Sequence, residues 1–208
     1  MQRDLVRTLA GVFAVATGLA ISLAPAIAQT PQAGGQGRGG ARGPQTPPLI
    51  MMTTAWQDGG VIPDRYTQAV EMAVSPALQW SQVPMGTQSF VLLMHDPEPV
   101  LNKGSKMDIT HWLIWNIPGS ATGLPEGVAQ GELPDGSRQV SLRANAYMGP
   151  GAPAGPYHHY TFELYALDIK LDVPQGTPPQ AADTRMAVFN AMDGHVLGKA
   201  LLVARFHR

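Results

Sequence analysis

The sequence predicts a mostly β protein, an antiparallel β-sandwich with helical segments near its C-terminus. Three observations support this fold class. Short apolar or alternating runs recur along the chain, Gly, Pro or Asn residues bound these runs, and helical periodicity occurs only after residue 180. The chain has 208 residues, 44% hydrophobic and 14% charged, so it can bury a sizeable core in one domain.

Residues 1–28 have the pattern of a secretory signal peptide. Arg3 and Arg7 precede an apolar stretch at 9–23, and Ala26-Ile27-Ala28 has the small-x-small form of a cleavage site. An uncleaved membrane anchor would need a longer apolar stretch of about 20 residues. We therefore expect cleavage after Ala28 and a periplasmic or secreted protein.

Composition divides the remaining chain into a linker and a domain. Residues 29–48 consist mainly of Gly, Pro, Gln and Ala, which cannot bury enough apolar surface to offset the entropy of ordering. We predict a disordered linker there and a folded domain at 49–208.

The charge balance and the lack of cysteine exclude several classes of function. Lys and Arg number 14 against 15 Asp and Glu, and no basic cluster with interleaved aromatic residues is present, so we expect no nucleic-acid partner. Without cysteine the chain has no disulfide, no thiol nucleophile and no cysteine for lipid attachment.

Six runs have the length and composition of β-strands. The run at 89–94 is almost entirely apolar, as is typical of a strand that is buried on both faces. The others alternate or are shorter, with turn residues between them. The predicted strands are Leu49–Thr54, Ala69–Val74, Ser89–Met94, Thr110–Ile117, Val140–Ala146 and His159–Leu167.

The C-terminal part predicts a helix at Ala181–Met192. Met186, Phe189 and Met192 would share one apolar stripe of this helix, with Asp183 or Thr184 as its N-terminal cap.

Beyond Gly194 the pattern is less decisive. Val196–Lys199 is predicted to form a second short helix. Leu201–Phe206 fits either the end of a helix or a last strand, because periodicity alone does not separate the two in a short apolar run.

The first candidate for a functional residue is Asp96, which follows the buried strand at 89–94. Pro97 and Pro99 end strand pairing directly after it, so Asp96 should lie at the rim of the domain, where a pocket can form. The alternative is a structural role, since Asp before Pro also caps turns.

Two histidines and a tyrosine are the next candidates. His111 opens one predicted strand, and His158 and Tyr160 open another, where residues two apart point to the same face. Phe162 and Leu164 continue that face, so the floor of a pocket there would be apolar. Each histidine taken alone also fits a structural role, satisfied by a backbone carbonyl.

A Gly/Pro-rich loop at 149–156 precedes His158. Glycine has no Cβ, so the N–H of Gly151 could approach a ligand closely. The set could hold a phosphate through His111, His158 and this N–H, while Asp96 orients a histidine or accepts from an ammonium. A carboxylate beside an imidazole favours the imidazolium, so we expect anion affinity to weaken as pH rises from about 5 to 8.

Three blocks of this sequence resemble the phosphatidylethanolamine-binding protein family, in its bacterial Raf-kinase-inhibitor-like branch. They are Asp96-Pro97-Glu98-Pro99, Thr110-His111-Trp112 through Asn116-Ile117-Pro118, and the Gly149–Gly155 loop leading to His158-His159-Tyr160. The resemblance implies two stacked antiparallel sheets of Greek-key type and C-terminal helical segments. It also implies a small anion-binding pocket formed by Asp96, His111, Gly151, Pro153, His158 and Tyr160.

The sequence departs from the family pattern at three positions. Family members commonly have Asp at the position of Glu98, Pro at that of Ala152 and Arg at that of His159. Strand parity directs His159 away from His158, so we expect the change to alter a supporting ion pair more than the pocket.

The leading hypothesis is an exported, non-catalytic binding protein for phosphate, carboxylate or a phospholipid head group, with regulation of an unidentified protein as a further role. No cofactor and no catalytic residue are expected. Two alternatives stay open. One is a metal-dependent hydrolase that uses Asp96, His111 and His158, since zinc takes such ligands. The other is a kinase or protease inhibitor that acts through a surface loop such as Val100–Met107.

Overall fold

The computed structural model describes residues 47–99, 103–104, 108–178 and 180–208. The predicted signal peptide, nearly all of the predicted linker and most of the loop at 100–107 lie outside these residues. Within the described part, no helix combines the length and the apolar character that crossing a membrane requires.

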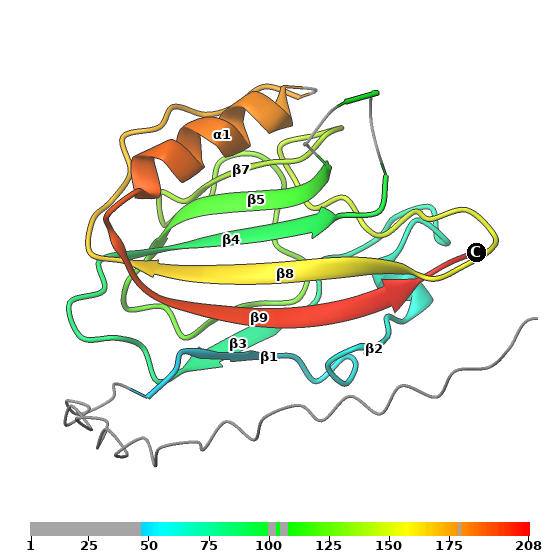
Figure 1. Cartoon of the computed structure of the whole chain (residues 1–208), viewed down its shortest axis with the longest axis horizontal. Coiled ribbons are helices and arrows are strands. Elements are labelled where there is room, and N and C mark those ends of the chain that lie inside the picture. The colour runs from blue at the N-terminus through cyan, green and yellow to red at the C-terminus, as the bar shows by residue number, and fades with distance from the viewer. Residues whose placement is uncertain (1–46, 100–102, 105–107, 179) are drawn as a thin grey trace, which may run out of the picture. The chain divides into compact units, whose positions relative to one another are not determined.

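The described strands form two sheets (Figure 1). The larger sheet has the order β2 (Gly60–Val61), β9 (Val196–Phe206), β8 (His158–Leu167), β4 (Ser89–Asp96), β5 (Ile109–Pro118), β7 (Arg138–Val140). The smaller sheet has the order β1 (Ile50–Met52), β3 (Leu78–Ser81), β6 (Gly123–Leu124). A 3-10 turn at Asp64–Tyr66 and one helix, α1 (Ala181–Met192), accompany the sheets. All pairings are antiparallel except that of β2 with β9.

The larger sheet is covered on both faces, by the smaller sheet on one side and by α1 on the other (Figure 1). Side chains of β4 alternate between two cores: Phe90, Leu92 and Met94 pack in the core shared with the smaller sheet, and Val91 and Leu93 pack in the core beneath α1. This arrangement explains the unbroken apolar run and confirms the prediction of a strand buried on both faces.

The strand order confirms a mostly β fold of the expected class. β8 follows β7 in sequence but returns to pair with β4, the long-range step that a Greek-key arrangement requires.

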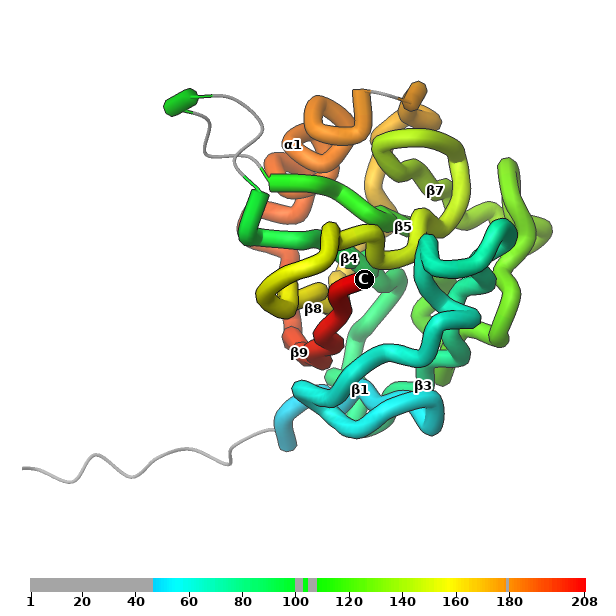
Figure 2. Tube along the Cα trace, turned by 90° about the vertical axis from the view of Figure 1, so that its right-hand side faces the viewer, coloured from blue at the N-terminus to red at the C-terminus, as the bar shows by residue number. Residues whose placement is uncertain are grey.

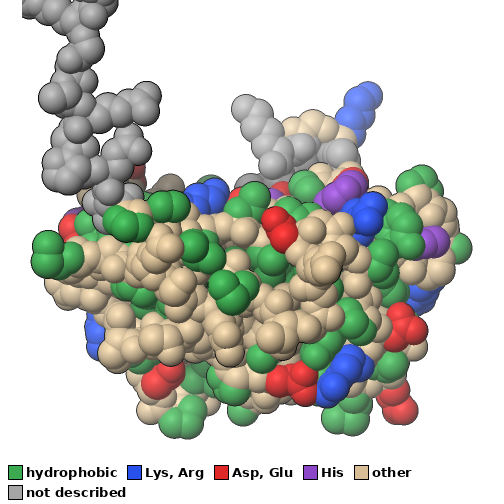
Figure 3. Space-filling model, turned by 90° about the horizontal axis from the view of Figure 1, so that it is seen from below, with side chains coloured by type: hydrophobic (Ala, Val, Ile, Leu, Met, Phe, Trp, Pro, Cys, Tyr) green, Lys and Arg blue, Asp and Glu red, His purple; other side chains and the backbone are tan. Residues whose placement is uncertain are grey.

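The face that bears the smaller sheet shows charged side chains scattered among hydrophobic and neutral ones (Figure 3).

The helix has the predicted bounds, and two residues of the predicted stripe, Phe189 and Met192, pack against the core, but the third does not. Ala181, Thr184, Val188 and Met192 face the core, whereas Met186 is 52% exposed. The predicted cap was also wrong: Gln180 precedes the helix, without a side-chain capping bond. The position of the sheet decides which face of the helix is buried, and the sequence alone allows more than one apolar face.

Two methionines of α1 provide a matched test of this face. We expect Met192→Ala to lower the free energy of unfolding by about 2–5 kcal/mol, because it leaves a cavity in the core. Met186→Ala should change it by less than about 0.5 kcal/mol. Urea unfolding of the two variants measures the difference, and equal losses would contradict the assigned face.

Three predicted strands were wrong or too long. Of Leu49–Thr54 only Ile50–Met52 is strand. Ala69–Val74 forms turns and bends, because no neighbouring strand pairs with it, and Met72 is largely exposed. Of the run at 140–146 only its first residue belongs to β7. Ser141 bonds through its backbone and its hydroxyl to Ala144, and this local turn replaces strand pairing.

The C-terminal segment is a strand throughout. The predicted short helix at Val196–Lys199 was wrong, and the ambiguous run at 201–206 is also strand, because both belong to β9. β9 pairs with β8 from Val196 to Phe206, so non-local hydrogen bonds decide the conformation that local periodicity left open.

Candidate functional site

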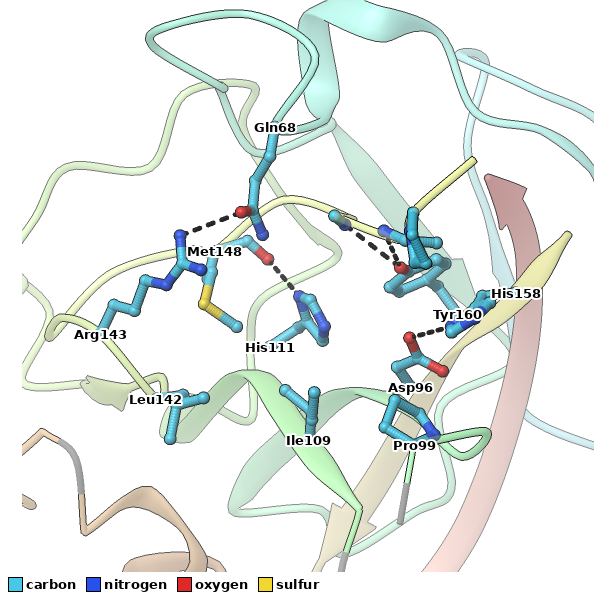
Figure 4. Close-up of a pocket in the computed structure, with 13 residues that line it drawn as sticks. Gln68, Asp96, Pro99, Ile109, His111, Leu142, Arg143, Met148, His158 and Tyr160 are labelled. Carbon is cyan, nitrogen blue, oxygen red and sulfur yellow. Dashed lines mark hydrogen bonds and ion pairs between the residues drawn. The ribbon is translucent and has the colours of Figure 1, made fainter. Parts of the chain in front are cut away.

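One cavity of about 160 Å³ brings together all six residues that the sequence singled out (Figure 4). It is lined by Asp96, His111, Gly151, Pro153, His158 and Tyr160. The loop at 149–157 supplies Gly151, Ala152 and Pro153 to its lining, and in the view along the strands this loop and the C-terminus lie at the same end of the domain (Figure 2). Seven further residues complete the lining: Gln68, Pro99, Ile109, Leu142, Arg143, Met148 and Ala152.

Neighbouring strands position the polar side chains. Asp96 is the last residue of β4, and β4 pairs with β8, which opens at His158. The carboxylate Oδ2 of Asp96 lies 2.8 Å from Nδ1 of His158. Oδ1 accepts a hydrogen bond from the backbone N–H of Glu98 at 3.1 Å, which fixes the turn after the strand. Asp96 therefore both caps the turn and contributes to the cavity.

Burial governs the protonation of Asp96. Its side chain is 3% exposed and that of His158 is 21% exposed. Burial raises the pKa of the Asp96 carboxyl above its usual value, although the hydrogen bond to His158 opposes the change. The bond from Asp96 to Nδ1 fixes the orientation of the His158 ring and leaves Nε2 available.

His111 lies in the middle of the site and is not the imidazolium that the sequence suggested. Its Nδ1 is 2.9 Å from the carbonyl oxygen of Met148 and 3.1 Å from that of Gly149. Burial lowers the pKa of His111 to about 4, so the ring is neutral at neutral pH. Carbonyls only accept hydrogen bonds, so Nδ1 carries the proton and Nε2 is an acceptor.

Tyr160 orders the glycine-rich loop. Its hydroxyl accepts hydrogen bonds from the N–H of Gly151 at 3.1 Å and of Ala152 at 3.0 Å. Its ring packs edge-on against His111, with centroids 5.0 Å apart. The N–H of Gly151 is therefore already engaged, contrary to the expectation that it is free to bind an anion. Burial and the charge of Asp96 raise the pKa of Tyr160, so its hydroxyl stays protonated.

With this geometry established, comparison with known proteins identifies the family. Residues 52–207 match the family model described as phosphatidylethanolamine-binding protein. The match spans well over half of the 208 residues. The chain belongs to the phosphatidylethanolamine-binding protein family.

Relatives with similar sequences support this membership. A UPF0098 protein of Methanothermobacter thermautotrophicus is 42% identical over 163 residues, which cover 77% of this chain and 99% of the relative. The UPF0098 protein YbhB of Escherichia coli is 36% identical over 138 residues, 64% of this chain and 81% of YbhB. LppC of Mycobacterium tuberculosis, named as a lipoprotein, is 34% identical over 168 residues, 78% of this chain and 74% of LppC.

Solved structures of the family share the fold. A phosphatidylethanolamine-binding protein homologue from Chlamydia trachomatis has a TM-score of 0.63 at 26% identity, with 77% of this chain and 98% of that chain covered. The family member YbcL of Escherichia coli has a TM-score of 0.60 at 23% identity, again with 77% and 98% covered, and shows the fold alone.

Two of the departures from the family pattern contact each other. His159 Nδ1 is 2.7 Å from Glu98 Oε1, and the backbone N–H of His159 donates to Oε2 at 3.0 Å. Burial acts against ionisation of Glu98, but the hydrogen bonds from the side chain and backbone of His159 and the interaction with Asp96 together outweigh it and lower the pKa of Glu98. His159 does not line the cavity, so this pair supports the turn after β4, as expected from strand parity.

The candidate metal ligands differ from the trio considered in the sequence. Among the described residues, the ligand atoms of Asp96, Glu98 and His158 lie within 4.8 Å of one another, and His111 is not part of this group. Asp96 and His158 bond to each other, and Glu98 bonds to His159. A metal ion would have to compete with these bonds.

Sequence reasoning missed two polar residues of the cavity, Gln68 and Arg143. Arg143 Nη1 donates to Gln68 Oε1 at 3.0 Å, and Gln68 Nε2 donates to the carbonyl of Gly149 at 2.7 Å. Neither residue belongs to a recognisable motif. Gln68 precedes one wrongly predicted strand and Arg143 lies within another, so no local signal placed them at the cavity.

Proposed function

We propose that this chain is an exported, non-catalytic binding protein whose cavity holds the polar group of a small anionic ligand, such as phosphate, a carboxylate or a phospholipid head group. The observation that carries the proposal is the convergence of acidic, imidazole, phenolic and guanidinium groups on one small cavity. Membership of a family of binding proteins agrees with it.

The size of the cavity limits the ligand. Pockets for drug-sized molecules usually measure about 300–1,000 Å³, whereas this one has about 160 Å³. A head group or a free anion fits this space, and acyl chains would remain outside.

Export rests on the predicted signal peptide. The name of LppC as a lipoprotein is in line with export of a related domain, although this chain has no cysteine for lipid attachment. Regulation of a protein partner is a further role within this proposal.

Ile109 offers a direct test, because it lines the cavity without belonging to the polar network. We expect Ile109→Trp to fill the cavity and weaken binding of inorganic phosphate at least tenfold in calorimetry, with the fold retained by circular dichroism. Ile169→Trp is the matched control, since Ile169 is also half-buried but packs against the core beneath α1, so the change should leave phosphate binding unchanged. Full binding by Ile109→Trp would refute the assigned site.

The grouping of Asp96, Glu98 and His158 supports one alternative, a metal-dependent hydrolase. Metal analysis of the purified protein separates the two functions. Stoichiometric zinc that is lost in a Glu98→Gln variant would favour the hydrolase, and metal-free protein that binds phosphate would favour the binding protein. Inhibition of a protease that survives Ile109→Trp would instead indicate a surface outside the cavity.

A further inference from the structure

The long strand β9 has a partner along its whole length on one side only (Figure 1). β8 pairs with it from Val196 to Phe206, whereas β2 pairs with it only at Ala204 and Arg205. In the described part of the chain, no strand pairs with the outer side of β9 before residue 204. An unpaired strand edge presents N–H and C=O groups to which another chain can bind.

The unpaired part of this edge ends at Val203. The N–H of Val203 donates to Oδ1 of Asp58 at 2.7 Å, and its carbonyl accepts from the N–H of Gly59 at 2.9 Å. Because the backbone groups of successive residues point to alternate sides of a strand, those of Lys199 and Leu201 point outward as well. Among the described residues, no turn, loop or side chain bonds to these four groups. We call Lys199 and Leu201 the free edge of β9.

The side chains of the free edge are also uncovered. Ala200 and Leu202 pack in the core shared with the smaller sheet, so Lys199 and Leu201 lie on the opposite face. That face is the one that α1 covers elsewhere, but among the described residues the core beneath α1 contains no member of β9. Leu201 is 51% exposed. Natural proteins usually protect an edge strand from pairing, whereas this one combines free backbone groups with an exposed leucine.

Lys199 indicates the charge of a matching strand. Its side chain is 47% exposed, and its Nζ lies 3.0 Å from Oε2 of Glu163. The same carboxylate oxygen accepts a hydrogen bond from the hydroxyl of Tyr165. An ammonium group has three donors, so Lys199 can bind a second acid while it keeps Glu163. Opposite charges on directly paired residues of neighbouring strands stabilise the pairing, and like charges weaken it.

We propose that the free edge of β9 binds an extended segment of a partner protein as an added antiparallel strand, with an acidic side chain opposite Lys199 and an apolar side chain opposite Leu201. The backbone hydrogen bonds supply affinity, and the two side-chain pairs supply selectivity. No residue that lines the cavity belongs to β9, so this surface is separate from the ligand site and does not depend on it.

A synthetic peptide with this pattern provides the probe. In acetyl-Thr-Val-Thr-Glu-Thr-Val-Thr-amide the glutamate and the valines share one face, and we expect wild-type protein to bind it in calorimetry. Replacing the glutamate of the peptide by lysine should weaken binding about fivefold. N-methylation of the glutamate and valine amides, which would point to β9, should abolish binding. N-methylation of the threonine amides, which would point away, should have little effect.

Substitutions in the protein test the two side-chain pairs. Lys199→Glu should weaken the glutamate peptide about fivefold and bind the lysine peptide more tightly than wild type does. Leu201→Lys should also weaken binding about fivefold, because it replaces the apolar pair. Met72→Lys is the matched control, since Met72 is an exposed apolar residue outside both sheets, and it should bind as wild type. Circular dichroism checks that each variant is folded.

Four results would overturn the proposal. Wild-type protein that does not bind the glutamate peptide would show that the edge does not accept a strand. Equal binding of the two N-methylated peptides, or loss of binding in Ile109→Trp, would place the peptide elsewhere, in the second case at the cavity. Self-association of wild type in sedimentation that Leu201→Lys removes would show that a second copy of the chain occupies the edge.

Discussion

We expect His158→Ala to lower the free energy of unfolding at pH 7 by about 1–3 kcal/mol, the usual cost of leaving a buried acceptor without its hydrogen-bond partner. The side chain of Asp96 is 3% exposed and its Oδ2 lies 2.8 Å from His158 Nδ1. Alanine would leave that carboxylate in a poorly solvated position, where among the described residues only the backbone N–H of Glu98 still donates to it.

The adjacent residue provides the control. His159 makes a similar bond to Glu98, but the two side chains are 52% and 35% exposed, so His159→Ala should cost less than about 1 kcal/mol. Urea unfolding of both variants measures the contrast. Adding Asp96→Asn to His158→Ala should recover much of the loss, because the unpaired charge is then absent. Equal losses at the two histidines would show that the buried pair does not stabilise the fold.

The pH dependence of His158→Ala should identify the buried charge as the cause. Loss of the imidazole removes the interaction that opposes burial, so the pKa of Asp96 should rise further. A carboxyl whose folded pKa is raised binds more protons in the folded state, and acidification then favours folding. The difference in free energy of unfolding between wild type and His158→Ala should therefore shrink as pH falls below 7.

The second large effect is a loss of stability on acidification that originates at His111. The folded pKa is about 4, and the unfolded value is about 6.5. Because the unfolded chain binds the proton more readily, stability from this group is complete above pH 6.5 and is lost as pH falls towards 4. A difference of about 2.5 pKa units corresponds to roughly 3 kcal/mol.

His111→Asn isolates this contribution, because asparagine keeps a donor for the Met148 carbonyl and does not titrate. The stability difference between wild type and variant should narrow by roughly 3 kcal/mol between pH 7 and pH 4. Carboxylates such as Glu163 and Asp108, whose pKa values are lowered by their partners, lose their contribution in both proteins and cancel. A difference that does not change with pH would contradict the neutral, Nδ1-protonated ring, which nitrogen-15 NMR also reports directly.

Phosphate binding should reduce the loss of stability that His111 causes on acidification. An anion beside His111 favours the protonated ring, so saturating phosphate should reduce the acid loss of wild-type stability and leave His111→Asn unaffected. It follows that anion affinity should begin to fall as pH rises above about 4, a lower range than the sequence suggested.

The comparison of sequence and structure shows where local patterns suffice. Apolar residues bounded by turn residues located β4, β5 and β8. Side chains of these strands that face the core must be apolar, whichever strands pair with them. Local patterns failed at Ala69–Val74 and at Val196–Lys199. In these segments the presence or absence of a partner strand decides the conformation, and that partner is distant in sequence.

For this protein the sequence by itself determined the fold class and the residue types at the ends of three strands, where Asp96, His111 and His158 lie. Only the tertiary structure decided how these groups act. Burial lowers the pKa of His111 and makes its ring neutral, and the Tyr160 hydroxyl accepts the hydrogen bond of the Gly151 N–H. Arg143, which lines the cavity, donates a hydrogen bond to Gln68. Protonation and hydrogen-bond partners depend on burial and on contacts between segments far apart in the chain, which local periodicity does not encode.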